Sequence, residues 1–130
     1  MLFRSPALPA GLQRVLLAFD GSAKAREALY VAAYIAGAWD TALVVMHCSA
    51  GAPDALDEAR TYLETHWTPA EYLTVKTSSV AAAILQTAAD KNSDLIVMGG
   101  YSTNPLRAIA FGGSVDAVLQ ARSHSVLLCS

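Results

Sequence analysis

The chain has 130 residues and a net charge of −2; 54% of its residues are hydrophobic and 15% are charged. This length and composition are typical of one globular domain with a sizeable core, and they exclude a disordered chain. The mildly acidic charge argues against a nucleic-acid-binding surface, which needs a basic face. Since the sequence has neither an apolar run of about 20 residues for a membrane helix nor the apolar core of a signal peptide, we expect a soluble, cytoplasmic protein.

Strands are the first elements that the pattern predicts. Residues 1–13 contain Pro6 and Pro9 and are expected to form an irregular lead-in to a single domain over residues 14–130. Short runs rich in Val, Leu and Ile follow, without the polar alternation of half-exposed strands, as is typical of strands covered on both faces. Including one weaker run, the expected strands are Val15–Phe19, Ala42–His47, Tyr72–Thr77, Leu95–Met98 and Ser125–Cys129.

Helical periodicity fills the intervals between these strands. The expected helices are Ala23–Ala38, Asp54–His66, Ser79–Lys91 and Ser114–Arg122. Ser22 has the side chain of an N-cap for the first of them. Strands that alternate with helices pair in parallel through right-handed crossovers, so we expect an open, doubly wound α/β sheet of five parallel strands. Ligands of such sheets bind beyond the carboxyl ends of the strands, where the winding reverses.

Two glycine pairs flank the loop after the fourth expected strand. Gly99–Gly100 end that strand, and Gly112–Gly113 precede the last helix at Ser114. Glycines allow close backbone approach, and a helix N-terminus presents N–H groups with partial positive charge, so this loop is a candidate phosphate site. The alternative is that both pairs only shape turns. No lysine follows the glycines as in a P-loop, and the pairs lie too far apart for the dinucleotide fingerprint.

Other polar residues each have two interpretations. Asp20, between the first strand and helix, is either a ligand contact or a cap for the helix. Arg107 is the only cation of the long loop, and it either meets a phosphate or is solvated. His47 is expected to be a hydrogen-bonded core histidine, and Trp39 and Trp67 are expected to pack or to lie at a rim. We find no metal-ligand spacing and no catalytic nucleophile–base pair in the sequence.

Several segments together resemble the universal stress protein family, from about Arg14 to the C-terminus. The family motif Gly-x2-Gly-x9-Gly-Ser/Thr is similar to Gly99-x-x-Ser102, followed by nine residues and Gly112. Further similar segments are Ala18–Ser22, Val44–Cys48, Asp94–Gly99 and Ser125–Cys129. The resemblance implies that residues 14–130 are a universal stress protein domain. It also implies the Rossmann-like fold of the adenine nucleotide alpha hydrolases, with strand order 3-2-1-4-5.

The resemblance further implies an adenine-nucleotide site. ATP or AMP would be the ligand, with Mg²⁺ only alongside bound nucleotide. The candidate binding residues are Ala18, Asp20, Cys48, Met98, Gly99, Ser102, Arg107, Gly112, Gly113 and Ser114. The chain departs from the motif at Ser102, where a glycine is usual, and at Gly113, where Ser or Thr is usual. The register Gly100-x-x-Thr103, with nine residues to Gly113–Ser114, restores the final Gly-Ser but not the second glycine.

The last strand, Ser125–Cys129, is a candidate interface. The resemblance implies a homodimer through this strand; the alternative is an edge shielded by residues 1–13. The function implied is that of a dimeric stress-response or signalling module that binds a nucleotide, with at most slow hydrolysis and no nucleic-acid or membrane partner. The alternative function is a universal stress protein that binds no nucleotide and acts as a protein-interaction scaffold.

Overall fold

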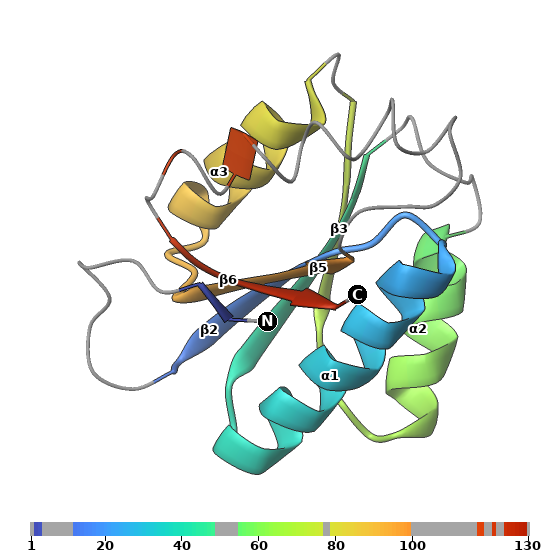
Figure 1. Cartoon of the computed structure of the whole chain (residues 1–130). Helices are drawn as coiled ribbons and strands as arrows, with labels where there is room; N and C mark the ends of the chain where they lie inside the picture. Colours follow the sequence, from blue (N-terminus) through green and yellow to red (C-terminus); the bar gives the residue numbers. More distant parts are fainter. Residues whose placement is uncertain are drawn as a thin grey trace.

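The computed structural model describes residues 2–3, 12–48, 55–76, 79–99, 117–118, 121 and 124–129. Its strands and helices alternate along most of this length (Figure 1). The strands are β1 (Leu2–Phe3), β2 (Arg14–Ala18), β3 (Ala42–Cys48), β4 (Glu71–Val75), β5 (Leu95–Gly99) and β6 (Ser125–Cys129). The helices are α1 (Ala23–Trp39), α2 (Ala55–Thr65) and α3 (Val80–Asp90). Of the last expected helix, Ser114–Arg122, the described residues are Ala117, Val118 and Ala121, and all three are helical.

The sheet has the order β1-β6-β5-β2-β3-β4, and the strands β2 to β6 are all parallel. If these five strands are numbered 1 to 5 along the chain, their order across the sheet is 3-2-1-4-5. The predicted doubly wound fold is therefore confirmed. Central β2 pairs with β3 on one side and β5 on the other, which aligns Ala18 with both Met46 and Met98. The point where the winding reverses therefore lies at β2 and β5, beside the carboxyl ends of these strands.

The sheet has one more strand than the sequence predicts. β1 pairs antiparallel with β6, with Leu2 opposite Leu127 and Phe3 opposite Val126. The expectation of a wholly irregular lead-in was therefore wrong at Leu2 and Phe3. The alternative, an edge of the last strand shielded by residues 1–13, holds at Val126 and Leu127. The physical reason is that an edge strand presents unpaired N–H and C=O groups, which a nearby extended segment can satisfy.

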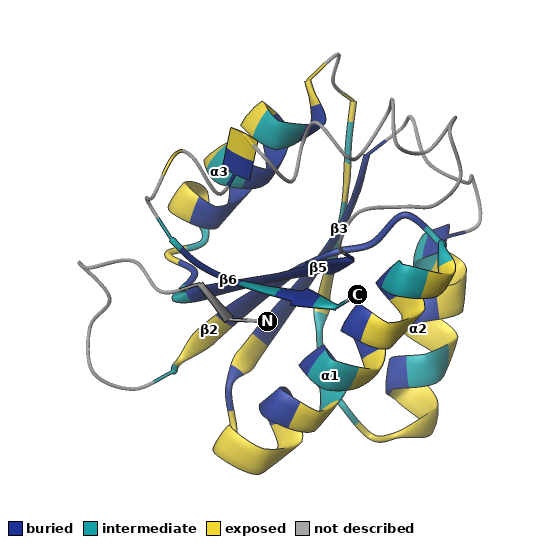
Figure 2. Ribbon diagram, viewed as in Figure 1, coloured by how far each residue is buried: buried dark blue, intermediate teal, exposed yellow. Residues whose placement is uncertain are grey.

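Helices cover both faces of the sheet. α1 and α2 pack on one face and α3 on the other, together with the short helical stretch that contains Val118 (Figure 1). Alternate residues of each buried strand belong to two separate hydrophobic cores, one on each face of the sheet. In β2, Val15 and Leu17 face α1 and α2, while Leu16 and Ala18 face α3. Burial on both faces explains why the central strands read as continuous apolar runs (Figure 2).

Helix α1 begins and ends where its capping residues dictate. The Oγ of Ser22 accepts a hydrogen bond from the backbone N–H of Ala25, as expected of an N-cap. At the other end Asp40 takes a left-handed conformation (φ 53°, ψ 45°), and its N–H donates to the carbonyl of Ala36. Gly37 stays inside the helix, which ends at Trp39, one residue later than expected. Because α1 follows the end of β2, its N-terminus lies at the carboxyl edge of the strands.

Candidate functional site

The carboxyl edge of β3, β2 and β5 brings together five of the ten candidate residues: Ala18, Asp20, Cys48, Met98 and Gly99. Phe19 continues the ladder beyond β2, because its N–H donates to the carbonyl of Met46 at 2.9 Å. Asp20 follows directly, so it lies at the same edge as Cys48, the last residue of β3, and Gly99, the last residue of β5. The other candidates, Ser102, Arg107, Gly112, Gly113 and Ser114, lie outside the described residues. The described part of the site is therefore the part formed by the ends of β2, β3 and β5.

Asp20 shapes the turn between β2 and α1. Its side chain is buried, and Oδ1 accepts a hydrogen bond from the N–H of Ser22 at 2.9 Å. Gly21 between them has φ 81°, a left-handed conformation that glycine adopts without strain. The Ser22 Oγ then accepts from the N–H of Ala25 at 3.1 Å. Asp20 thus holds the turn before the helix, whereas the N-cap of α1 is Ser22. The carboxylate of Asp20 lies at the edge where ligands of such sheets bind.

Gly99 lies directly against the first turn of α1. A Cβ at this position would be 3.0 Å from the backbone N of Ala25 and 3.0 Å from both the backbone C and the Cβ of Lys24. Only a residue without a side chain lets the end of β5 approach the helix this closely. The sequence predicts a glycine at the strand end because of the turn. The need for a glycine against α1 comes from tertiary packing, and no local sequence pattern indicates it.

The end of β3 is held to β2 by a buried histidine. His47 is 5% exposed, and its Nδ1 lies 3.3 Å from the carbonyl oxygen of Phe19. Because a carbonyl only accepts, Nδ1 carries the proton in this contact. His47 is therefore the hydrogen-bonded core histidine that the sequence suggests. The next residue, Cys48, faces the opposite core, and burial raises the pKa of its thiol, so the thiol stays protonated at neutral pH.

This edge offers a buried carboxylate and main-chain groups rather than a reactive pair. A carboxylate in such a position can accept hydrogen bonds from ligand hydroxyls, and the strand ends can line a flat ring. Within the described residues no three His, Cys, Asp or Glu side chains are grouped as metal ligands. In the same part of the chain, no helix is long and apolar enough to cross a membrane.

Removing the cap of α1 is expected to weaken the fold at this edge. Ser22→Ala deletes the oxygen that accepts from the Ala25 N–H, and loss of such a cap costs about 1 kcal/mol. Urea unfolding followed by circular dichroism measures the free energy of unfolding. Ser79 caps α3 in the same way, through the N–H of Ala82 at 3.4 Å, so Ser79→Ala is the matched control for a cap on the other face. An unchanged stability for Ser22→Ala would contradict the capping role.

The comparisons with known proteins agree with this geometry. A universal stress protein in complex with cAMP has a TM-score of 0.76 at 23% identity, over 93% of this chain and 98% of that one. A family member from Burkholderia pseudomallei gives 0.72 at 20% identity, over 92% and 97%. The Archaeoglobus fulgidus universal stress protein in complex with dAMP gives 0.69 at 20%, over 92% and 98%. These likenesses establish the fold.

The family itself is established by sequence. A search of curated proteins returned no significant match. The family model described as "Universal stress protein family", however, matches residues 50–130, which is more than half of the chain. This match covers the loop with the glycine pairs and the last three parallel strands, β4, β5 and β6. The chain therefore belongs to the universal stress protein family.

Proposed function

We propose that the protein binds an adenine nucleotide, ATP or AMP, at the carboxyl edge of its sheet. The adenosine end would lie against Asp20 and the end of β3 at Cys48, beside the strand ends Ala18 and Met98. The phosphates would lie at Gly99 and the loop after it, on the residues Ser102, Arg107, Gly112, Gly113 and Ser114. Mg²⁺ would enter only with the nucleotide. The bound protein would act as a cytoplasmic stress-response or signalling module.

The observation that carries this proposal is the buried Asp20 carboxylate between the ends of β3 and β5. Its Oδ1 is directed by the Ser22 N–H, so the carboxylate is fixed before any ligand arrives. A preorganised acceptor loses little entropy on binding, which favours affinity for ligand hydroxyls. Two structures with the same fold hold adenine nucleotides, cAMP in one and dAMP in the other. These facts support an adenine nucleotide over other phosphate ligands.

We also propose a homodimer through the last parallel strand, Ser125–Cys129. Within the described residues, β1 pairs with only Val126 and Leu127 of β6, so a second copy would either displace these two residues or pair beside them. A two-residue strand contributes few ladder hydrogen bonds, so its displacement costs little compared with a full strand pairing. Native mass spectrometry of protein purified without added ligand reports the dimer and any retained nucleotide in one spectrum.

Calorimetric titration with ATP, AMP and cAMP tests nucleotide binding directly. We expect binding by the native chain and a loss of at least about tenfold in affinity for Asp20→Asn, because an amide replaces a charge-assisted acceptor worth about 1.5–3 kcal/mol. The amide oxygen can still accept from the Ser22 N–H, so the turn is kept. Asp90→Asn is the matched control, because Asp90 is exposed at the end of α3, at the amino edge of the strands.

Absence of heat and of a thermal shift with all three nucleotides would contradict the proposal. That outcome would favour the scaffold alternative, in which the fold is kept and Ser102 and Gly113 leave the loop unable to hold phosphate. Fast ATP turnover that is lost in Asp20→Asn would instead reveal an enzyme. We expect at most slow hydrolysis, because the sequence offers no evident base or arginine finger.

A further inference from the structure

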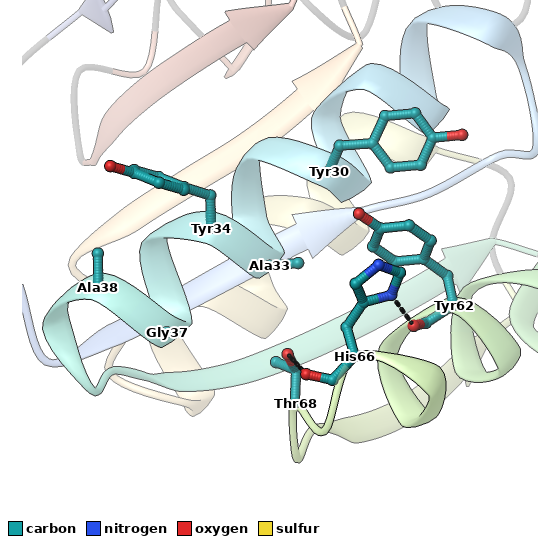
Figure 3. Close-up of a pocket in the computed structure, with 8 residues that line it drawn as sticks. All are labelled: Tyr30, Ala33, Tyr34, Gly37, Ala38, Tyr62, His66 and Thr68. Atoms are coloured by element: carbon teal, nitrogen blue, oxygen red, sulfur yellow. Dashed lines mark hydrogen bonds between the residues drawn. The ribbon is translucent and has the colours of Figure 1, made fainter.

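A groove of about 550 Å³ lies over α1 and the adjoining end of α2 on the outer face of the molecule (Figure 3). It lies near the C-terminal ends of both helices, because its lining includes Gly37 and Ala38 from α1 and His66 just after α2. These ends lie toward the amino edge of the strands, whereas the nucleotide site proposed above lies at the carboxyl edge. The groove is therefore a separate feature, and a test of it does not depend on the nucleotide site.

Aromatic rings form both walls of the groove. On the α2 side the ring of Tyr62 stacks on His66 with centroids 4.1 Å apart, and it meets Tyr30 of α1 at 4.8 Å. On the far side of α1, Tyr34 meets Trp39 edge-on at 6.4 Å. Tyr34 remains 71% exposed, although its ring is held in place by this contact. Exposed aromatic side chains gathered in this way mark interaction surfaces rather than a sealed core.

The floor between these walls is made of small residues. Ala33 points from α1 toward the Tyr62–His66 pair, and Gly37 and Ala38 follow along the helix, with Ala38 on the side of Tyr34 (Figure 3). A Cβ added to Gly37 would find no atom within 4 Å, so space is open above the helix at this point. At the other end of the seam, an ion pair between Arg26 and Glu58 joins the two helices. The groove is thus bounded at that end and shallow along its length.

The size and polarity of the groove select the kind of partner. Eight residues line it, whereas a stable interface between folded proteins takes about 20–30 residues on each side, so a short segment fits better than a domain. Its walls are helices, whose backbones offer no ladder to an added strand. None of the lining residues carries a carboxylate or an ammonium group, so an uncharged segment is the electrostatic complement.

Polyproline II segments have the complementary chemistry. They are preformed, their backbone carbonyls make no internal hydrogen bonds, and their proline rings pack on aromatic faces. Tyr30, Tyr34 and Tyr62 supply hydroxyl donors along the groove. His66 is held in place through its Nδ1, which lies 2.8 Å from the Tyr62 carbonyl oxygen. We propose that this groove over α1 and the end of α2 is a docking site for a proline-rich, extended segment of a partner protein.

A fluorescein-labelled decaproline peptide is the probe, with a glycine–serine peptide of equal length as its control. Fluorescence anisotropy is expected to report binding of decaproline alone. Tyr34→Ala should weaken it at least about tenfold, as expected for an aromatic anchor. Gly37→Leu should abolish it, because the new side chain fills the open space while leucine favours the helix. Trp67→Ala is the matched control, because Trp67 is 92% exposed and does not line the groove.

Three results would overturn the proposal. The first is that decaproline does not bind the native chain. The second is that the glycine–serine peptide binds equally well. The third is that Gly37→Leu binds as the native chain does while its circular dichroism and thermal midpoint show an intact fold. Chemical-shift mapping of the ¹⁵N-labelled protein adds the location: decaproline is expected to shift the amides of Ala33, Gly37 and His66 and to leave those of Ser22 and Gly99 unchanged.

Discussion

Replacing Phe19 by alanine is expected to lower the free energy of unfolding by about 3–5 kcal/mol, the range found for truncating a buried phenylalanine. Phe19 is 1% exposed and packs in the core beneath α1 and α2. Its backbone also joins the ends of two strands, since its N–H donates to Met46 and its carbonyl oxygen contacts His47. The cavity would open directly beneath Asp20, so we expect the site to lose its fixed geometry together with the stability.

Guanidinium chloride unfolding of the native chain and the variant measures this loss. Trp67→Ala is the matched control, since it truncates an aromatic side chain that is 92% exposed. A surface change of this kind is expected to stay within about 0.5 kcal/mol of the native chain. If Phe19→Ala were as stable as Trp67→Ala, the packing of β2 beneath the helices would have to be different from that described.

Gly99→Ala is expected to destabilise the protein by about 1–3 kcal/mol, the usual cost of overpacking a tight contact. The added methyl group would stand 3.0 Å from the backbone of Lys24 and Ala25, so either α1 or the end of β5 must move. Because Asp20 and Ser22 lead into the same helix, the movement would also disturb the candidate site. We therefore expect nucleotide affinity to fall together with stability.

The same substitution at Gly37 provides the control. Gly37 lies inside α1 with open space at its Cβ position, so Gly37→Ala should raise stability by up to about 1 kcal/mol through helix propensity. Opposite signs for the two glycine variants in thermal and urea unfolding would confirm that the position, not the substitution, decides the effect. Equal effects at both sites would contradict the close approach of β5 to α1.

The fold was largely predictable because its strands and helices carry strong periodic signals. Runs such as Leu95–Gly99 are apolar throughout because the sheet buries them on both faces. The apolar pattern in the sequence therefore predicts the buried strands of the structure. β4 was the least accurate strand: it begins at Glu71 and ends at Val75, whereas the pattern suggested Tyr72–Thr77. Its mixed exposure at the sheet edge explains the weaker signal. β1 could not be predicted, since two residues cannot show a period.

The candidate site was predictable only in part. Asp20 stands out because an acid at a strand-to-helix turn either caps the helix or contacts a ligand, and the structure adds its bond to the Ser22 N–H. The contact of Gly99 with Lys24 joins residues far apart in the sequence, so no local pattern encodes it. The aromatic groove was missed for the same reason: Tyr30 and Tyr62 lie on different helices and meet only after packing.

Nucleotide binding at the carboxyl edge is tested most directly by adding AMP to the ¹⁵N-labelled protein and recording amide chemical shifts. If the account is right, the amides of Asp20, Ser22, Cys48 and Gly99 will shift as AMP is added, and those of Gly37 and His66 across the molecule will not. Spectra that stay unchanged at saturating AMP, or that change only around Gly37 and His66, would contradict it.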